Sequence, residues 1–485
     1  MSAGPLDPKT APTFPMAARV AMGDSQLRKN VRHATEVIQA KRARVVEEMQ
    51  DWQALREAGK QIRQHTMQHL DFYLEQFEVN CTRVGGVVHW ARDAAEARQI
   101  VVGLVKASGS GEVIKIKSMT TEEIQLNPAL EAAEIHPYET DLAELIIQLG
   151  QDQPSHIVVP ALHKNRQQIR EIFQRTMHLP KLGDKPEDLA DAARMFLREK
   201  FLRVKTGVSG ANFLIAETGG VCVVESEGNG RMCLTLPETL ITIAGIDKIL
   251  PHYQDLEVML QLLPRSATGE RMNPYNSIWT GVYAGDGPRV FHVVLMDNAR
   301  TAILADEEAR QTLNCIRCGA CQNVCPVYRQ TGGHAYGSVY AGPIGAILTP
   351  QLQEMQHAQS LPYASSLCGA CYEVCPVKIN IPEVLIHLRN KVVLQNTSGI
   401  AGLFDVESAA MKAMAAIFRS ERRFRAAQRL GRIAQTPLVR KDEKGLGWIS
   451  WLPGLLGGWS QARDLQEMPK ETFRDWWEKR SEHDS

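Results

Sequence analysis

The chain has 485 residues, of which 55 are Lys or Arg and 55 are Asp or Glu, so its formal net charge is zero. This length is enough for two to four domains. Balanced charge without a long run of one sign argues against a nucleic-acid track or an acidic tail. The start lacks the apolar segment of a secretory signal, and no stretch is apolar and long enough to span a membrane. We therefore expect a cytoplasmic protein whose neutral surface favours association with other subunits.

The region from about 28 to 80 is charged, helix-favouring and free of proline. This pattern predicts one long helix or a pair of helices. Because acidic and basic residues are interleaved, a solvated face is expected rather than a nucleic-acid surface. We place an N-terminal helical segment at residues 1–80.

Residues 81–298 alternate short β-rich runs with amphipathic helical stretches, which predicts an α/β domain with a largely parallel sheet. The β-rich runs include GVVHW, EVIKIKS, SHIVVPALH, FLIAE, GVCVVES, RMCLTLP, LITIAG and RVFHVVLM. A further helix is expected at about 185–201, with a capping box formed by Asp184 and Glu187.

Ten cysteines in a chain of this kind indicate metal binding rather than disulfides. Seven of them lie in two runs, CIRCGACQNVCP and SSLCGACYEVCP, which begin at Cys315 and Ser365. The runs share the core Cys-Gly-Ala-Cys-x-x-Val-Cys-Pro-Val and are an internal duplication. The second run has Ser365 where the first has Cys315.

The spacing of the first run is typical of iron–sulfur ligation. Two-residue gaps let three thiolates of one loop reach three corners of a cubane, whereas a four-cysteine zinc site uses two separated pairs. In two-cluster ferredoxins the fourth cysteine of a run ligates the other cluster. This rule predicts one cluster held by Cys315, Cys318, Cys321 and Cys375, and a second held by Cys325, Cys368 and Cys371.

The predicted second cluster has only three thiolates, which leaves three alternatives. It is a [4Fe–4S] cluster whose fourth iron binds solvent, Ser365 or a partner group; it is a [3Fe–4S] cluster; or it takes a distant thiolate. The distant cysteines, Cys81, Cys222 and Cys233, stand among apolar residues and are expected to be ordinary buried thiols. Between the runs, GPIGAILTPQLQEMQ favours a helical module at residues 299–390, in which His334 and Tyr336 are expected to pack within the loop.

The α/β domain has no G-x-G-x-x-G fingerprint, Walker A run or H-E-x-x-H, and the chain has no adjacent cysteine pair. It therefore shows no flavin or nicotinamide site for a two-electron oxidation. Open α/β sheets bind ligands at strand ends, which makes several polar residues weak candidates. These are His156 and His163 at the two ends of an expected strand, Lys117, Ser118, Glu122, and Glu217 in the turn that contains Thr218, Gly219 and Gly220.

Residues 391–485 are expected to be helical and end in a Trp-rich tail. The apolar stretch WISWLPGLLGGW, residues 448–459, is broken by proline and glycines. We expect it to pack against another domain or subunit rather than to enter a membrane.

The order of SMTTEE, HIVVPALHKNR and IAETGG, followed by the two cysteine runs, resembles the LutB family, also called LldF or YkgF, over nearly the whole chain. The resemblance implies a LUD domain with a fold of the sugar-phosphate isomerase (NagB/RpiA) and CoA-transferase-like group, a two-cluster ferredoxin domain and a short helical C-terminal domain. It also implies that Glu217 is a weak catalytic candidate, and that a second cluster motif of three cysteines is normal for the family.

The function implied by the resemblance is that of an iron–sulfur subunit in a cytoplasmic complex that oxidises L-lactate to pyruvate and allows growth on lactate. Its implied partners are a Cys-Cys-Gly-rich subunit, a second LUD-domain subunit and an electron acceptor. The alternative is that the LUD domain and the open-site cluster form a catalytic site in this chain for a small hydroxy acid or a CoA-type ligand.

Overall fold

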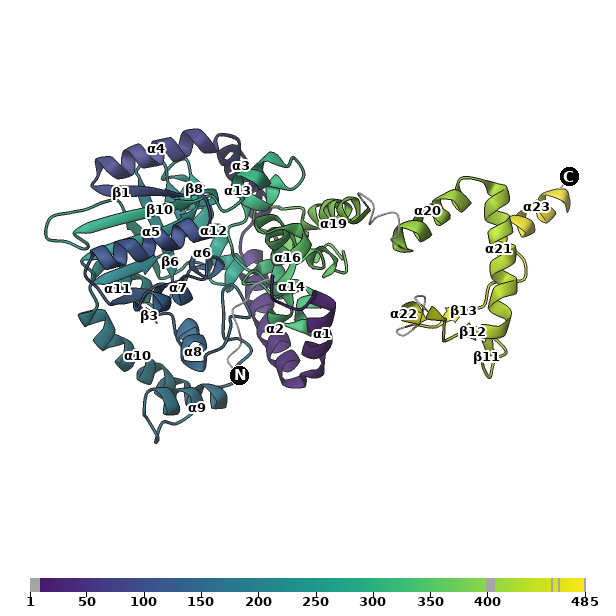
Figure 1. Ribbon diagram of the computed structural model, residues 1–485, viewed down its shortest axis with the longest axis horizontal. Coiled ribbons are helices and arrows are strands. Elements are labelled where there is room, and N and C mark those ends of the chain that lie inside the picture. The colour runs from purple at the N-terminus through teal and green to yellow at the C-terminus, as the bar shows by residue number, and fades with distance from the viewer. Residues whose placement is uncertain (1–8, 398–405, 455–456, 461–462, 484–485) are drawn as a thin grey trace. The chain divides into compact units, whose positions relative to one another are not determined.

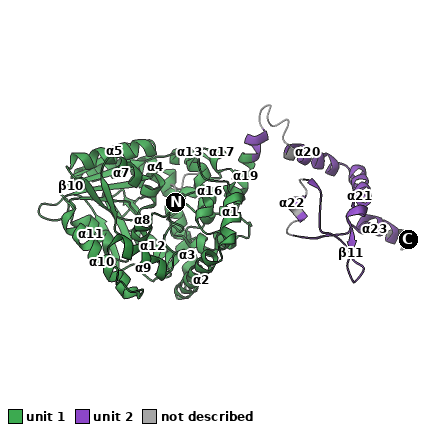
Figure 2. Cartoon of the chain, turned by 60° about the horizontal axis from the view of Figure 1, so that its bottom comes forward, with its two compact units in different colours: residues 1–392 green, residues 393–485 purple. Residues whose placement is uncertain are grey.

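The computed structural model describes residues 9–397, 406–454, 457–460 and 463–483. The chain forms two compact units, residues 1–392 and residues 393–485 (Figure 2). Within the described residues, no helix is long and apolar enough to cross a membrane.

Four helices begin the first unit: α1 (Phe14–Gly23), α2 (Ser25–Glu47), α3 (Trp52–Gln68) and α4 (Leu70–Arg83). The expectation of one helix or a pair between 28 and 80 is wrong, because three helices occupy that region. The breaks between these helices let each new helix turn its own apolar side toward the core. Trp52 begins α3 and Leu70 begins α4, and both residues are buried. The helices α2 and α3 therefore pack on the cysteine-bearing region and on α12, while α4 packs on the edge of the main sheet (Figure 1).

The main sheet has six strands, all parallel, in the order β1-β10-β7-β4-β2-β3. Their bounds are β1 Gly86–Ala91, β2 Glu112–Lys115, β3 His136–Glu139, β4 Thr206–Ser209, β7 Thr239–Gly245 and β10 Val290–Met296. A second sheet, β8-β5-β6-β9, consists of β5 Phe213–Ile215, β6 Gly220–Glu225, β8 Ile249–Leu250 and β9 Tyr275–Trp279. The predicted α/β class with a parallel sheet is confirmed.

The main sheet is buried on both faces, which explains its continuous apolar strands. Along β7, Ile241 and Ile243 contact a core made with α5 and α7, while Leu240 and Ala244 join the core on the other face. The helices around the two sheets are α5 Ala94–Ala107, α6 Met119–Glu123, α7 Leu126–Ala132, α8 Leu142–Gly150, α9 Arg166–Thr176, α10 Pro186–Arg203, α11 Asn229–Thr235, the short η1 Ile246–Lys248, α12 Asp255–Ala267 and α13 Arg300–Ala305.

Three local expectations for this domain are wrong. The run SHIVVPALH forms turns rather than a strand, because Pro154 precedes it, Pro160 interrupts it, and its apolar side chains pack on the cysteine-bearing region. RMCLTLP lies largely in α11, whose start is fixed by Gly228 in a left-handed conformation and by the Glu225 carboxylate, which accepts backbone N–H groups. Lys185 is the N-cap of α10 and Pro186 its first residue, so the capping box is not formed.

The cysteine-bearing region is helical, as predicted. Its elements are η2 Arg310–Asn314, α14 Ala320–Val324, α15 Pro326–Thr331, η3 His334–Tyr336, α16 Gly342–Leu352, α17 Met355–Ala358, η4 Leu361–Tyr363, α18 Ala370–Val374 and α19 Ile381–Thr397. The duplication in the sequence is a duplication in the backbone. Helices α14 and α18 each have five residues, follow a glycine in the left-handed conformation and pack against each other.

The second unit contains α20 Val406–Phe418, α21 Glu421–Gln435, η6 Thr436–Leu438, α22 Gly457–Ser460 and α23 Phe473–His483. It also contains a small antiparallel sheet that the sequence did not predict, β11 Arg440–Lys441, β12 Gly447–Ile449 and β13 Leu465–Gln466. The apolar stretch at 448–459 begins in β12, where Trp448 donates a hydrogen bond to Asp442. Residues 455–456 of that stretch lie outside the described residues.

Candidate metal centre

The first cysteine loop joins η2 to α14 and holds three thiols. Arg317 and Gly319 both have positive φ, 60° and 74°, so the chain makes a tight turn around Cys318. The backbone N–H of Arg317 donates to the Cys315 sulfur at 3.4 Å. Cys318 and Cys321 are buried, and Cys315 is half-buried. The loop thus directs its thiols toward one another from a short stretch of chain.

The second loop repeats this geometry, with Ser365 in the place of Cys315. Leu367 and Gly369 have φ values of 54° and 83°, and they stand at the positions equivalent to Arg317 and Gly319. The backbone N–H of Leu367 donates to the Ser365 hydroxyl oxygen at 3.1 Å, as the N–H of Arg317 does to the Cys315 sulfur. Because a non-glycine residue with positive φ is uncommon, its recurrence at the same position indicates one loop design. Ser365 therefore stands where a first cysteine would stand.

The last cysteine of each run lies beside the thiols of the other run. Burial raises the pKa of Cys318, and the neighbouring negative charges of Cys375 and Cys315 raise it further. Burial raises the pKa of Cys371 to about 12, with contributions from Cys325 and Cys368. These mutual effects require short distances, since charges interact as the inverse of their separation. Following the crossing rule, we call Cys315, Cys318, Cys321 and Cys375 the first thiol group, and Cys325, Cys368 and Cys371 the second thiol group; the charge of Cys371 also acts on Cys321, so the two groups adjoin.

The spacing of the sulfurs suits a multinuclear cluster better than a single ion. A tetrahedral zinc ion with Zn–S bonds of about 2.3 Å brings its sulfurs to about 3.8 Å from one another. Among the described residues, Asp152, His163 and His334 have ligand atoms that lie within 4.8 Å of one another. No three cysteine sulfurs of these residues lie that close together. Soft thiolates at wider spacing are the donor set of an iron–sulfur cluster, so these residues fit such a group.

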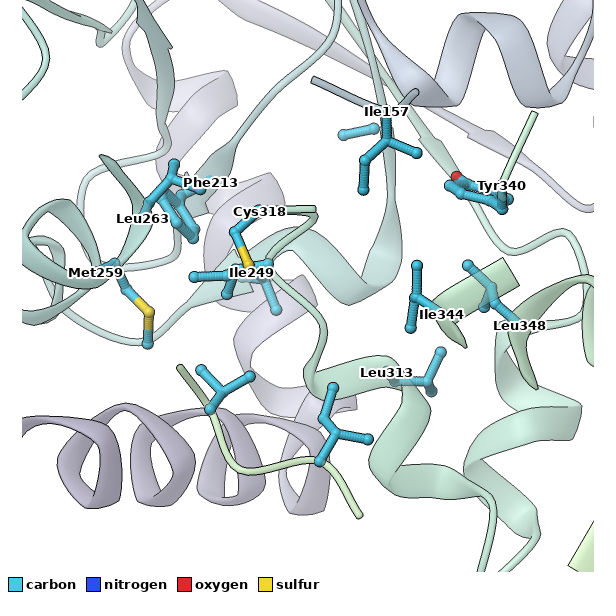
Figure 3. Close-up of a cluster of buried hydrophobic side chains, with 14 of the residues drawn as sticks. Ile157, Phe213, Ile249, Met259, Leu263, Leu313, Cys318, Tyr340, Ile344 and Leu348 are labelled. Atoms are coloured by element: carbon cyan, nitrogen blue, oxygen red, sulfur yellow. The ribbon is translucent and has the colours of Figure 1, made fainter. Parts of the chain in front are cut away.

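The two thiol groups differ in exposure. Figure 3 shows Cys318 within the cluster of buried side chains that also contains Ile249 and Met259. In the second thiol group, Cys368 is exposed, and so are Leu367 and Tyr372 beside it. Cys325 and Cys371 are buried like most cysteines of the first thiol group, so the second thiol group reaches the surface through Cys368 alone.

Positive side chains from the N-terminal helices contact the first thiol group. Arg56 donates to the backbone carbonyl of Cys375 at 2.9 Å, and Arg42 donates to that of Val374 at 3.2 Å. Arg63, which is fully buried, donates to the carbonyl of Leu313 at 2.9 Å. The expectation of a wholly solvated basic face on these helices is wrong for these three arginines. In the sequence, Arg56 and Arg63 stand seven positions apart and share one face of α3, whereas Arg42 belongs to α2.

A buried ion network fixes the first cysteine loop to the α/β domain. Arg300 donates to both carboxylate oxygens of Glu123, at 3.0 and 2.9 Å, and to Asp247 at 2.6 Å. Asp247 also accepts from Arg317 at 3.3 Å, and Tyr340 donates to Glu123 at 2.6 Å. Paired charges of this kind hold their elements in register because breaking one pair leaves its partner buried and uncompensated.

The two histidine candidates act as links between domains. His156 is buried, bonds to Asn323 of α14 through Nε2 at 3.2 Å, and accepts the backbone N–H of Val158 at its Nδ1. Burial lowers the pKa of His156 to about 3, so the imidazole is neutral. His163 lies between Ser155 at 2.7 Å and Asp152 at 3.1 Å. Neither stands at the end of a strand, because the expected strand is absent.

The remaining candidates lie apart from one another. Glu217 is exposed and accepts the backbone N–H of Tyr253 at 2.9 Å. Glu122 pairs with Lys115 at 3.0 Å, whereas Lys117 and Ser118 line a cavity described below. His334 donates a hydrogen bond from Nε2 to the backbone carbonyl of Gln153 at 2.8 Å, and Tyr336 packs on Phe14, as expected for loop packing.

The three cysteines outside the runs are buried thiols, as predicted. Cys81, Cys222 and Cys233 are completely buried in the α/β domain, and burial raises the pKa of each to about 12. Cys233, in α11, bonds at 3.4 Å to Thr140, which follows β3, so it lies away from the cysteine loops. Such thiols are poor ligands because the thiolate is the metal-binding form.

Family models match three successive regions of the chain. The LUD domain matches residues 74–296, the 4Fe–4S dicluster domain matches residues 311–379, and the C-terminal domain of lactate utilisation protein B matches residues 392–482. A solved structure, a DUF162 family protein from Deinococcus radiodurans, matches with a TM-score of 0.27 and 13% identity, covering 47% of this chain and 98% of its own.

Curated relatives match over nearly their full length. Lactate utilization protein B 1 of Bacillus mycoides is 42% identical over 469 residues, which is 96% of each chain. Lactate utilization protein B of Bacillus subtilis is 43% identical over 465 residues, or 94% of this chain and 95% of the relative. Identity at this level over this length shows common descent, and the duplicated cysteine loops lie within the matched region. The chain therefore belongs to the lactate utilization protein B family.

Proposed function

We propose that this chain is the iron–sulfur electron-transfer subunit of a cytoplasmic complex that oxidises L-lactate to pyruvate and so allows growth on lactate. The observation that supports it best is the pairing of a buried thiol group with one at the surface, in a domain of the dicluster type. The relatives are named for lactate utilization, and the proposed substrate is taken from those names. The proposed partners are a Cys-Cys-Gly-rich subunit, a second LUD-domain subunit and an electron acceptor.

In this proposal each thiol group holds one cluster. Cys315, Cys318, Cys321 and Cys375 hold a [4Fe–4S] cluster, and Cys325, Cys368 and Cys371 hold a second one with a non-thiolate corner or a [3Fe–4S] core. The chain divides into a helical segment at 1–80, the LUD domain at 81–298, the ferredoxin domain at 299–390 and the C-terminal region at 391–485. Clusters of this kind exchange electrons with a partner and thereby separate the two-electron chemistry of lactate from single-electron transport.

The chain's own residues set the environment of each thiol group. The backbone N–H of Ile379 donates to the Cys375 sulfur at 3.3 Å, and that of Tyr328 donates to the Cys325 sulfur at 3.5 Å. Hydrogen bonds to the sulfurs and nearby positive charge favour the more negative, reduced state. The exposed second thiol group is the proposed point of exchange with a partner, and the arginine-rich surroundings of the first make it the proposed electron store.

The experiment that tests the relay compares the isolated chain with the reconstituted complex. The isolated chain, purified without oxygen, is expected to have clusters that dithionite reduces and that an oxidised dye, added after the dithionite is removed, reoxidises, and to leave L-lactate unchanged. Adding the partner subunits is expected to make its clusters reducible by L-lactate. Pyruvate formation by the isolated chain would overturn the relay and favour the alternative in which this chain itself is catalytic.

Ser365→Cys is expected to complete the second cluster. An iron without a thiolate ligand is lost first on oxidation, so air-oxidised wild-type protein is expected to show the electron paramagnetic resonance signal of a [3Fe–4S] cluster. The Ser365→Cys protein is expected to lose that signal. Ser366→Cys, which adds a thiol at the exposed neighbouring position, is the matched control and should retain it. A signal that survives in Ser365→Cys would place the open corner elsewhere.

Arg42→Gln is expected to lower the reduction potential of the buried cluster by on the order of 30–60 mV, because reduction adds negative charge that Arg42 stabilises. A redox titration followed by electron paramagnetic resonance measures this shift. Arg44→Gln makes the same change in charge on the exposed face of α2, where solvent and salt screen it, and should shift the potential much less. Equal shifts in the two variants would contradict the assignment of Arg42 to the first thiol group.

A further inference from the structure

A cavity of about 360 Å³ lies where the carboxyl ends of three parallel strands meet the first cysteine loop. Lys117 and Ser118 follow β2, Gly210 follows β4 and Lys248 follows β7, and all of them line it. Arg317, between two cysteines of the first thiol group, closes one side. The carboxyl edge of a parallel sheet is where such domains bind ligands.

Lys248 lies in this cavity without a partner. Its side chain is 9% exposed, and among the described residues it has no hydrogen bond or ion pair. The adjacent carboxylate of Asp247 is already bound by Arg300 and Arg317. Burial lowers the pKa of Lys248 to about 7; Arg317 lowers it further, while Asp247 and the Cys315 thiol oppose the shift. The Nε atom of Arg317 is also buried without a partner.

The other charged groups of the cavity are occupied. Lys117 pairs with Glu144 at 3.1 Å. Asp141 accepts the backbone N–H groups at the start of α8, Glu225 accepts those at the start of α11, and Glu227 accepts that of Leu142. Among the described residues that line the cavity, Lys248 is therefore the charged side chain without a hydrogen-bond or ion-pair partner. An unpaired buried cation costs folding free energy, and a bound anion offsets that cost.

We propose that the cavity binds a small carboxylate, whose oxygens accept hydrogen bonds from Lys248 and Arg317. The volume suits a small organic acid, and the polar side chain of Ser118 lies in the same wall. That the acid is a 2-hydroxy or 2-oxo acid, such as L-lactate or pyruvate, rests on the proposed function. Because Arg317 belongs to the first cysteine loop, the bound carboxylate lies beside the first thiol group and changes its electrostatic environment.

Isothermal titration calorimetry of the full-length, cluster-loaded chain with sodium L-lactate and with sodium pyruvate tests the site. One site per chain is expected, with affinity at least tenfold lower in Lys248→Met and within a few-fold of wild type in Lys248→Arg. Lys106→Met, an exposed lysine of α5, is the matched control and should bind as wild type does. Absence of binding by both acids, or unchanged binding in Lys248→Met, would overturn the proposal, and equal binding of inorganic phosphate would overturn the carboxylate class.

Two further measurements keep the outcome interpretable. Lys248→Met removes an unpaired buried charge, so it is expected to melt at the same temperature as ligand-free wild type or higher, which excludes misfolding as the cause of lost binding. Pyruvate is expected to change the electron paramagnetic resonance signal of the buried cluster in wild type but not in Lys248→Met. Failure of the relay would be seen as pyruvate formation by the isolated chain, and failure of the site as absence of acid binding to that chain, so the two failures are separate results.

Discussion

Replacing Cys375 by alanine is expected to remove the cluster held by the first cysteine run, although Cys375 belongs to the second. The pKa of Cys375 is raised to about 11, mainly by burial, and the charge that contributes from another thiol is that of Cys315. Removing one thiolate of a buried four-thiolate site leaves an iron without a ligand in the core, where solvent cannot replace it. Iron content should fall by about half, and the signal of the buried cluster should vanish.

Cys325→Ala makes the reciprocal change and is expected to remove the exposed cluster while leaving the buried one. The two clusters can be told apart because the exposed one, beside Cys368, reacts faster with a chelator or an oxidant. Cys222→Ala, a buried thiol of β6 outside both groups, is the control and should retain all the iron. Loss of the exposed cluster in Cys375→Ala would show that each run holds its own cluster. In the reconstituted complex, Cys375→Ala should abolish lactate-dependent electron transfer.

The cysteine loops could be predicted from sequence because their geometry is local. Closely spaced cysteines and a following Cys-Pro restrict the chain to a few conformations, and the duplication shows the pattern twice. The structure adds that the repeat includes the positive φ values of Arg317 and Leu367. No sequence pattern marks those two residues, since neither is a glycine.

The surroundings of the loops could not be predicted, because they depend on packing between segments far apart in the chain. Arg56 and Cys375 are 319 positions apart, and their contact requires α3 to pack against the second cysteine run. The sequence did not mark Lys248 as a candidate site residue, because a lysine after a strand is ordinarily exposed. The run SHIVVPALH was expected to be a strand because its apolar residues indicate burial. A turn that packs on another domain buries apolar residues as well as a strand does.

Arg300→Met is expected to lower the free energy of unfolding of the first unit by about 3–5 kcal/mol, because it leaves Glu123 and Asp247 buried without their common partner. Chemical denaturation followed by circular dichroism measures the change. Arg194→Met, which breaks an exposed pair with Asp191, is the control and should change stability by less than about 1 kcal/mol. A loss of stability no greater than that of Arg194→Met would show that solvent stabilises the charges of Glu123 and Asp247.

The pH dependence of stability checks the same network independently. Burial on its own raises the pKa of Glu123 and of Asp247, but the charge and hydrogen bonds of Arg300 outweigh it, and both pKa values lie below their ordinary range. A depressed carboxyl pKa contributes stability above the pKa of the unfolded chain, and this contribution is lost as the pH falls below about 4.5. Wild-type stability should therefore fall on acidification, and Arg300→Met should show a weaker fall, since protonation relieves its uncompensated carboxylates. A fall as steep as that of wild type would mean that Arg317 or Tyr340, rather than Arg300, keeps these groups ionised.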